Sequence, residues 1–388
     1  MSVQRAVNIQ DLRRRAQRRL PKPVFDFIDG GAQDERTLAA NCADFSGIRF
    51  LPRQLVDVST RRTDVRVLGQ DLALPIILGP TGLTGMFGPG GEVAAARAAA
   101  AAGVGYCLST MATTSIETMV QTAKGFWFQL YVQRDRAVTR SLVERAQAAG
   151  CPVLVLTTDT VVQGNRERDM RNGFTVPLKL TPGRALDFAR RPGWVWRMAS
   201  GPPITFANLV SPGQSQLNFL SVAQHAARQF DQSLNWKDVE WLKSIWPGKL
   251  VIKGILSPDD ARRAADHGAD AVIVSNHGGR QLDDVPSTIT ALPRIVDAVG
   301  AHLDVLIDGG IRRGSDVVKA LALGAKACLI GRAFLFGLAA GGEAGVGRCL
   351  QIFADEIDRV QALVGAPVLR DIDRSFLAEP PSAWPANR

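Results

Sequence analysis

The chain has 388 residues and a mass of 41.7 kDa, which is enough to bury a large core without disulfide or metal staples. Hydrophobic residues make up 46% and charged residues 21%, which excludes wholesale disorder. The formal net charge is +9, but the basic residues are spread along the chain without interleaved aromatic residues, so nucleic-acid binding is not expected.

The five cysteines are scattered, and no two are spaced as a CxxC pair. With only four histidines as further ligands, neither a zinc site nor a disulfide framework is expected. No apolar run reaches the roughly eighteen residues of a membrane-spanning helix, and the basic N-terminus lacks the apolar core of a secretory signal. These features predict a cytoplasmic protein without a metal site.

Residues 1–60 are expected to form helices that pack across the domain that follows. From about residue 75 the sequence alternates short runs rich in Val, Ile and Leu with amphipathic stretches that end at glycine. Short, nearly continuous apolar runs are typical of parallel strands that are covered on both faces. The predicted strands are 75–78, 104–108, 126–130, 153–156, 250–252, 271–274, 303–307 and 327–330.

Helices are predicted between these strands at 92–102, 136–149, 259–267 and 316–323, each with a glycine at its C-terminal end. A further amphipathic helix is expected at 342–365. Eight strands, each followed by a helix, predict an α/β fold of the (β/α)₈ or TIM-barrel type. The alternative is an open doubly wound sheet, which usually has fewer strands and a glycine-rich fingerprint that is missing here.

A long loop insertion, about 160–235, follows the fourth predicted strand. Its middle part, 177–213, is rich in Pro and Gly and carries Trp194, Trp196 and five basic residues with a single acid, Asp187. Two interpretations stay open: a lid over the active site, or an interfacial patch that contacts a membrane. We expect one domain over 1–379 and a loose Pro-rich tail at 380–388.

Barrel enzymes hold their chemistry at the C-terminal ends of the strands. All eight predicted ends carry polar residues or glycines, which favours an active site there. In chain order these ends are Pro80-Thr81-Gly82, Ser109-Thr110, Gln129-Leu130-Tyr131, Thr157-Thr158-Asp159, Lys253, Ser275-Asn276-His277, Asp308-Gly309-Gly310 and Gly331-Arg332.

The last two strand ends predict a phosphate site. Both open helices, whose first N–H groups favour anions, and they bring the guanidinium groups of Arg312 and Arg332. The alternative is two tight turns whose glycines are needed only for positive φ.

The run 275–283, with the sequence SNHGGRQLD, is the most specific signal in the chain. His277 and Arg280 lie three residues apart on a glycine-rich turn. There the arginine can bind a carboxylate while the histidine acts as a base near neutral pH. Asp159 is suited to orienting that histidine, although a cap on a loop is an alternative role.

Two further cations have open interpretations at this stage. Lys253 ends an apolar run, where a lysine needs a partner. Arg166 stands in a run of alternating charges, where it is either a ligand for a substrate anion or a member of a solvated ion-pair cluster.

These motifs together resemble the family of FMN-dependent α-hydroxy-acid dehydrogenases and oxidases, over about residues 11–371. The 275–283 run is the most specific, and 20–22, 129–132, 156–159 and 252–254 support it. The stretches 80–83, 166–169 and 236–246 look closest to the branch of mandelate dehydrogenases and flavin-type lactate dehydrogenases.

The resemblance implies oxidation of an (S)-2-hydroxy acid to the 2-keto acid, with FMN as cofactor. His277 would take a proton with the support of Asp159. Arg280 and Arg166 would hold the carboxylate, and Tyr131 would contact it or the reacting oxygen. Lys253 would lie beside flavin N1. The other cofactor contacts would come from Pro80, Thr81, Gly82, Ser109, Gln129, Thr157 and Ser275, and those to the phosphate from Asp308, Gly309, Gly310, Arg312, Gly331 and Arg332.

Two residues depart from the family pattern. Phe27 stands where a tyrosine hydroxyl usually helps to hold the carboxylate, and Met111 where glycolate oxidase-like members have tryptophan. Both make the pocket more apolar and favour a bulky or aryl side chain, as in mandelate, with L-lactate as an alternative. Gly82, where many oxidases have alanine, favours a dehydrogenase that passes electrons to a quinone.

The alternatives are an oxidase that reduces oxygen to H2O2, and, in a different class, a non-redox isomerase or lyase that binds a phosphate. The resemblance further implies a homotetramer. It also implies a cytoplasmic location, with the possibility of peripheral contact with the inner face of a membrane through 177–213.

Overall fold

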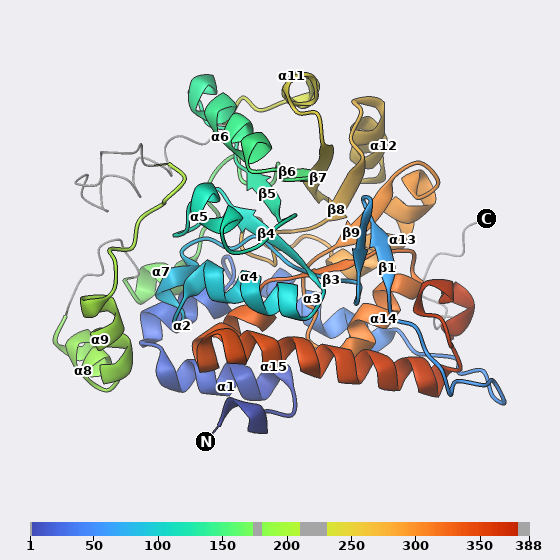
Figure 1. The fold of residues 1–388 in the computed structure, drawn as a ribbon, viewed down its shortest axis with the longest axis horizontal. Helices are drawn as coiled ribbons and strands as arrows, with labels where there is room; N and C mark the ends of the chain where they lie inside the picture. Colours follow the sequence, from blue (N-terminus) through green and yellow to red (C-terminus); the bar gives the residue numbers. More distant parts are fainter. Residues whose placement is uncertain (1, 174–180, 210–230, 379–388) are drawn as a thin grey trace.

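The computed structural model describes residues 2–173, 181–209 and 231–378. Eight parallel strands close into a barrel in chain order, with the last strand paired to the first (Figure 1). The predicted TIM barrel is therefore confirmed, and every strand overlaps its predicted range. The strands are β3 (Ile76–Leu78), β4 (Gly105–Ser109), β5 (Trp127–Leu130), β6 (Val153–Thr157), β7 (Lys249–Ile255), β8 (Ala271–Val274), β9 (Asp304–Ile307) and β10 (Cys328–Ile330).

The four helices predicted between the strands are present. They are α4 (Gly91–Ala101), α6 (Arg136–Ala148), α12 (Pro258–Asp266) and α14 (Gly314–Ala322), and the predicted glycine stands two residues after the end of each. The helices α5 (Ile116–Val120), α11 (Trp236–Ile245) and α13 (Thr288–Val299) complete the outer layer of the barrel.

The N-terminal segment forms α1 (Ile9–Arg19), α2 (Lys22–Asp29) and α3 (Arg36–Ala43), as predicted. In α1, Ile9, Leu12 and Ala16 are buried at helical spacing, because this face packs along α15 (Figure 1). The three helices thus add a second layer on one side of the barrel.

The predicted C-terminal helix, 342–365, is present as the second half of α15 (Arg332–Val364). The element is broken at Gly341 and Gly342, where the backbone leaves helical φ/ψ, and its first half, before this break, was not predicted. Next to this break a Cβ added at Gly345 would lie 1.9 Å from the carbonyl oxygen of Gly337. The glycines therefore allow the two halves of the helix to cross at backbone contact, and in the sequence they resemble a helix boundary.

A short antiparallel hairpin, β1 (Val65–Val67) with β2 (Gln70–Leu72), was not predicted. Its inward residues Val65, Val67 and Leu72 are buried against the apolar residues of the barrel interior, so the hairpin closes the N-terminal end of the barrel. Each strand has only three residues, which is too short for alternation of polar and apolar residues to be recognised.

The sequence predicts that the insertion is a loop, but the described part of it contains helices. It contains α7 (Glu167–Arg171), α8 (Pro182–Ala189) and α9 (Pro192–Ser200), and a proline opens both α8 and α9. Residues 174–180 and 210–230 of the insertion, and the predicted tail 380–388, lie outside the described residues. None of the helices that the structure describes is both long and apolar enough to span a bilayer.

Candidate active site

The barrel interior is layered, because side chains alternate between the two faces of a strand. One interior layer is apolar and consists of Ile77, Cys107, Trp127, Val155, Val251, Ile273, Leu306 and Leu329. Two positions further along each strand, at its C-terminal end, the inward residues are polar or glycine. They are Gly79, Ser109, Gln129, Thr157, Lys253, Ser275, Asp308 and Gly331. A ring of polar groups therefore lies directly above an apolar layer that fills the barrel interior.

Above this ring lies a cavity of about 830 Å³, which is within the usual range for small-molecule and cofactor sites. Of the twenty-one predicted site residues, all line the cavity except Asp159, Gln129 and Ser275. These three lie directly behind the lining and are hydrogen-bonded to it. The structure thus brings every predicted site residue to one place.

Ser109, Gln129 and Thr157 form a hydrogen-bonded chain across one side of the ring. The hydroxyl of Ser109 donates to Oε1 of Gln129 at 2.9 Å, and Nε2 of Gln129 donates to Oγ1 of Thr157 at 2.9 Å. All three side chains are buried. Because both ends of the Gln129 amide are engaged, its orientation is fixed.

Lys253 is only 4% exposed and supplies a positive charge to the ring. Its Nζ donates to the hydroxyl of Ser275 at 2.8 Å and lies 3.0 Å from Oδ2 of Asp308. Burial opposes the charged form, but Asp308 and Asp159 outweigh it and raise the pKa of Lys253 above its ordinary value. The other carboxylate oxygen of Asp308 is buried and has no hydrogen-bond partner within the described residues.

His277 lies on the turn after β8 with φ +56°, a conformation that costs a non-glycine residue about 1–3 kcal/mol and is typical of functional sites. Its Nδ1 is 2.8 Å from Oδ1 of Asp159. Despite burial, His277 and Lys253 hold the pKa of Asp159 below its ordinary value. Asp159 is therefore ionised, and Nδ1 of His277 must carry the donated proton.

Burial also lowers the pKa of His277, and the attraction of Asp159 only partly opposes this. The imidazole is therefore neutral at pH 7. With its proton on Nδ1, the lone pair is on Nε2. A neutral histidine held in this way, and lining the cavity, is arranged as a general base.

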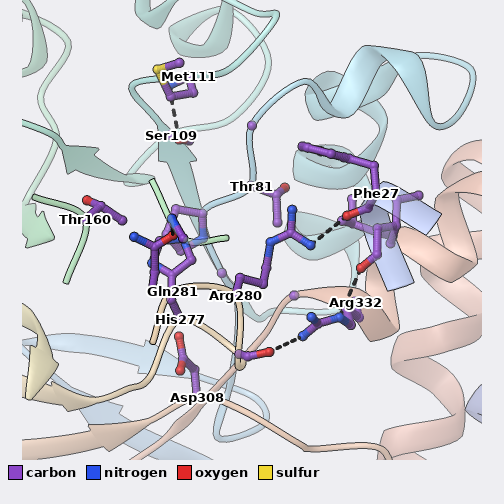
Figure 2. A pocket seen from close by; sticks show the side chains of 18 of the residues that line it. Phe27, Thr81, Ser109, Met111, Thr160, His277, Arg280, Gln281, Asp308 and Arg332 are labelled. Atoms are coloured by element: carbon purple, nitrogen blue, oxygen red, sulfur yellow. Dashed lines mark hydrogen bonds between the residues drawn. The ribbon is translucent and has the colours of Figure 1, made fainter. Parts of the chain in front are cut away.

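Two arginines of the cavity have no carboxylate within ion-pair distance among the described residues. Arg280 donates to the carbonyl oxygens of Phe27 (2.6 Å) and Gly30 (3.0 Å), and its guanidinium carbon lies 4.9 Å from the centre of the Phe27 ring (Figure 2). Arg166 donates to the Arg280 carbonyl oxygen at 3.3 Å and to Gln281 at 3.2 Å. Burial, followed by repulsion from Arg166, lowers the pKa of Arg280. Such a pair attracts an anionic ligand.

Arg166 is held in place from outside the cavity. It directly precedes α7, and Arg168 of that helix pairs with Asp29 of α2 at 3.0 Å. One acid of α7, Asp169, also lines the cavity, and burial raises its pKa in spite of the nearby charge of Arg280.

The turn after β9 has the open geometry expected of an anion site. Gly309 and Gly310 both have positive φ, and a Cβ at Gly310 would lie 1.7 Å from the carbonyl oxygen of Asn41. Arg312 follows on the cavity wall. Arg332, also in the wall, donates to three carbonyl oxygens, those of Ile28, Gly278 and Gly30, at 3.0, 2.8 and 2.7 Å (Figure 2). These three carbonyl acceptors were not predicted from the sequence.

Glu92, in the first turn of α4, joins the loops after β3 and β4. Its buried carboxylate accepts hydrogen bonds from the N–H of Thr84 (3.2 Å), from the N–H and hydroxyl of Thr113 (2.7 and 2.6 Å) and from the hydroxyl of Thr114 (3.1 Å). These two loops carry Pro80–Gly82 and Met111, so one carboxylate fixes that side of the cavity.

Sequence reasoning missed the part of the cavity wall that the insertion supplies. Residues 162–165, Asp169, Met170 and Phe206 all line the cavity. Phe206 is held there by its neighbour Asn208, which donates to the carbonyl oxygen of Ser109 and accepts from the N–H of Ile116. These contacts support the lid interpretation of the insertion. Within the described residues no group of three His, Cys, Asp or Glu side chains is placed to hold a metal ion.

Comparisons with known proteins identify the family of the chain. The family described as FMN-dependent dehydrogenase matches residues 16–379. The chain is 47% identical to an L-lactate dehydrogenase of Caulobacter vibrioides, over 95% of this chain and 97% of the relative. It is 44% identical to an L-lactate oxidase of a Nostoc species, over 97% and 99%. The crystal structure of the monotopic membrane protein (S)-mandelate dehydrogenase matches with a TM-score of 0.93 at 44% identity, over 96% of this chain and 99% of that one.

Proposed function

The chain belongs to the FMN-dependent dehydrogenase family, and on this premise we propose that it oxidises an (S)-2-hydroxy acid with a bulky or aryl side chain to the 2-keto acid. Membership makes it an FMN-dependent oxidoreductase of the 2-hydroxy-acid dehydrogenase and oxidase family and sets aside the non-redox alternative. The observation that carries the proposal is the pairing, in one cavity, of a neutral histidine base with two arginines that have no carboxylate within ion-pair distance in the described part of the chain.

The cavity fits FMN as the resident cofactor. Its volume exceeds the need of a small acid, the buried Oδ1 of Asp308 awaits a donor, and the glycines at 309 and 310 leave the backbone open for a phosphate. The residues proposed to hold the ring and its chain are Pro80, Thr81, Gly82, Ser109, Gln129, Thr157, Lys253 and Ser275. Those proposed for the phosphate are Asp308, Gly309, Gly310, Arg312, Gly331 and Arg332.

When bound, FMN supplies the acceptor for the α-hydrogen and the two electrons of its C–H bond. Nε2 of His277 takes the hydroxyl proton as the carbonyl double bond forms, and the carboxylate of Asp159 stabilises the resulting imidazolium. Arg280 and Arg166 hold the substrate carboxylate. Burial, with the charge of Asp159, raises the pKa of Tyr131 to about 12, so its hydroxyl keeps its proton and donates to the substrate.

Anaerobic stopped-flow absorbance of the FMN-loaded protein tests this function. Mixing with (S)-mandelate should bleach the flavin band rapidly, and (S)-lactate should do so more slowly. If both acids leave a demonstrably bound flavin oxidised, the proposed substrate class is wrong. Admission of oxygen afterwards separates a dehydrogenase, whose flavin is reoxidised slowly, from an oxidase, whose flavin is reoxidised rapidly. An oxidase is the second candidate function because a relative from a Nostoc species is named L-lactate oxidase.

The preference for a bulky side chain rests on the apolar wall. The rings of Phe27 and Phe87 stack with centroids 6.1 Å apart, and Leu83, Met111 and Phe206 line the same cavity. An aryl side chain of the substrate buries more apolar surface against this wall than a methyl group does, so the wall favours aryl substrates.

Replacing Phe27 by tyrosine should reduce the preference for (S)-mandelate over (S)-lactate. The new hydroxyl adds a hydrogen bond to the substrate carboxylate, which is worth about 1.5–3 kcal/mol when the acceptor is charged. We expect kcat/KM for (S)-lactate to rise about tenfold or more, and to rise less for (S)-mandelate. Phe50→Tyr, outside the cavity, is the control. An unchanged lactate to mandelate ratio would contradict the proposed role of position 27.

The pH profile should follow His277. The base acts in its neutral form, and its pKa lies below the ordinary value of about 6.5. Therefore kcat/KM should be constant above pH 6.5 and fall as the pH drops through the lowered pKa. Asp159→Asn removes the negative charge that favours imidazolium. It should therefore lower the pKa of His277 further and move the fall in kcat/KM to still lower pH. An acid limb centred above pH 6.5 in the wild type would contradict the assignment.

We further propose that the acceptor is a quinone and that α8 and α9 contact a membrane surface. Trp196 is 75% exposed beside exposed Val195, and Leu186 and Arg190 of the same helix pair are exposed too. Large exposed apolar side chains next to basic ones suit an anionic bilayer. The related mandelate dehydrogenase is described as a monotopic membrane protein. The homotetramer stays a prediction, which light scattering tests.

Trp196→Glu should abolish co-sedimentation of the protein with vesicles that contain phosphatidylglycerol, because it removes the largest apolar contact and adds a repelled charge. Leu363→Glu, which changes a 69% exposed residue of α15, is the matched control and should leave sedimentation unchanged. Equal binding by wild type and Trp196→Glu would reject this surface.

A further inference from the structure

The N-terminal helix α3 is bound at both ends to the loop that carries His277. At its start, the buried carboxylate of Asp283 accepts hydrogen bonds from the N–H groups of Arg36 (3.2 Å) and Thr37 (2.8 Å). Just before the helix, the N–H of Ala32 donates to the carbonyl oxygen of Gly279 at 2.8 Å. The segment from Ala32 through α3 therefore stabilises the turn after β8 in addition to packing on the barrel.

In the last turn of α3, Asn41 forms a reciprocal amide pair with Asn276, the residue before His277. Nδ2 of Asn41 donates to Oδ1 of Asn276 at 2.8 Å, and Nδ2 of Asn276 donates back at 2.9 Å. The two residues are 1% and 5% exposed. Asn276 also binds the N–H of Gly279 and the carbonyl oxygen of Pro286, so its amide holds the turn together.

The same Asn41 contacts the glycine turn after β9. Its carbonyl oxygen is so close to Gly310 that no side chain fits there, and its Oδ1 lies 3.4 Å from the position of a Cβ at Gly309. The Oδ1 also accepts from the N–H of Thr288 at 3.2 Å, and the hydroxyl of Thr288 donates to the carbonyl oxygen of Asp308. One buried residue therefore touches the base-carrying turn and the proposed phosphate turn.

We propose that Asn41 is a positioning residue that fixes the spacing between these two turns, and with it the placement of bound FMN relative to His277. Asn41 does not line the cavity. Its side chain acts through Asn276 and through Thr288, whose hydroxyl binds the carbonyl oxygen of Asp308. Its loss would leave one N–H of the buried Asn276 amide and the N–H of Thr288 without their acceptor. The proposal rests on the proposed function for the roles of His277 and FMN.

The test compares Asn41→Ala with Asn235→Ala. Asn235 caps α11 far along the chain, and its side chain accepts from the N–H of Lys237 in a capping box, so this control also loses a structural asparagine. The readouts are the Kd for FMN from quenching of flavin fluorescence, the limiting anaerobic rate of flavin reduction by (S)-mandelate at saturating FMN, and Tm.

We expect Asn41→Ala to raise the Kd for FMN at least tenfold and to lower the limiting reduction rate at least tenfold. Asn235→Ala should lower Tm while both other values stay within twofold of the wild type. If Asn41→Ala lowers Tm but leaves the Kd and the rate within twofold, its role is only structural and the proposal is overturned.

A double variant sharpens the test. Because Asn41 and Asn276 share one amide pair, the loss in Asn41→Ala/Asn276→Ala should be smaller than the product of the two single losses, whereas independent roles would multiply them. Should Asn41→Ala fail to fold, Asn41→Asp keeps the shape, replaces the donor to Asn276 by a second acceptor and adds a negative charge, and the same criteria apply. If the wild type itself is never reduced by a hydroxy acid, the proposed function fails, and the Kd for FMN still decides the role of Asn41.

Discussion

His277→Gln is expected to lower the limiting rate of flavin reduction by about 10²–10⁴-fold, the usual contribution of a general base. Glutamine can still accept the hydroxyl hydrogen bond, but it cannot take the proton. It also cannot use the charge of Asp159, whose Oδ1 lies 2.8 Å from the imidazole. Stopped-flow reduction by (S)-mandelate, with the visible flavin spectrum to show that FMN stays bound, measures this loss.

His302→Gln is the matched control, since that histidine is exposed on the turn before β9 and does not line the cavity. Its reduction rate should equal that of the wild type. A His277→Gln variant that binds FMN and is reduced within fivefold of the wild-type rate would show that another group takes the proton.

Lys253→Met is expected to have the second largest effect, because it breaks a buried ion pair. Asp308 would keep its charge with neither oxygen paired, and removal of one partner of such a pair costs about 3–5 kcal/mol. The Kd for FMN should therefore rise and the reduction rate fall, each by two orders of magnitude or more. Fluorescence titration with FMN and urea unfolding measure the cofactor affinity and the free energy of unfolding separately.

Lys249→Met, four residues earlier on the same strand, is the control. Lys249 pairs with Asp270 at 2.9 Å but is exposed, so its loss should cost no more than about 1 kcal/mol and leave FMN binding intact. If Lys253→Met retains wild-type FMN affinity and reduction rate, the charge in the polar ring has no role in cofactor binding.

The barrel was predictable from the sequence because its strands are buried on both faces and read as short apolar runs. The polar ring was predictable for a related reason. Every strand changes from apolar to polar at its C-terminal end, and neighbouring parallel strands present those ends at one rim. Lys253 is the clearest case, since it directly follows the apolar run 250–252 and its partner, Asp308, stands at another of the eight ends.

Contacts to the backbone were not predictable. The carbonyl oxygens that accept from Arg280 and Arg332 belong to residues 27, 28, 30 and 278, and a carbonyl group has no signature in the sequence. Asn41 was missed for a similar reason, because an asparagine in a helix carries no sign of a partner in a distant loop. The first half of α15 was missed because residues 333–340 are all buried, so this stretch shows no amphipathic period in the sequence.

The amide pair of Asn41 and Asn276 joins positions 235 apart in the chain, whereas all donors to Glu92 lie within 22 positions of it. During synthesis on the ribosome, the side of the cavity that Glu92 organises can form early from one continuous stretch. The opposite side must wait until β8 and its turn have been made, and contacts over such separations form slowly. The two sides of the cofactor site can therefore be joined only after β8 and the turn that follows it have been made.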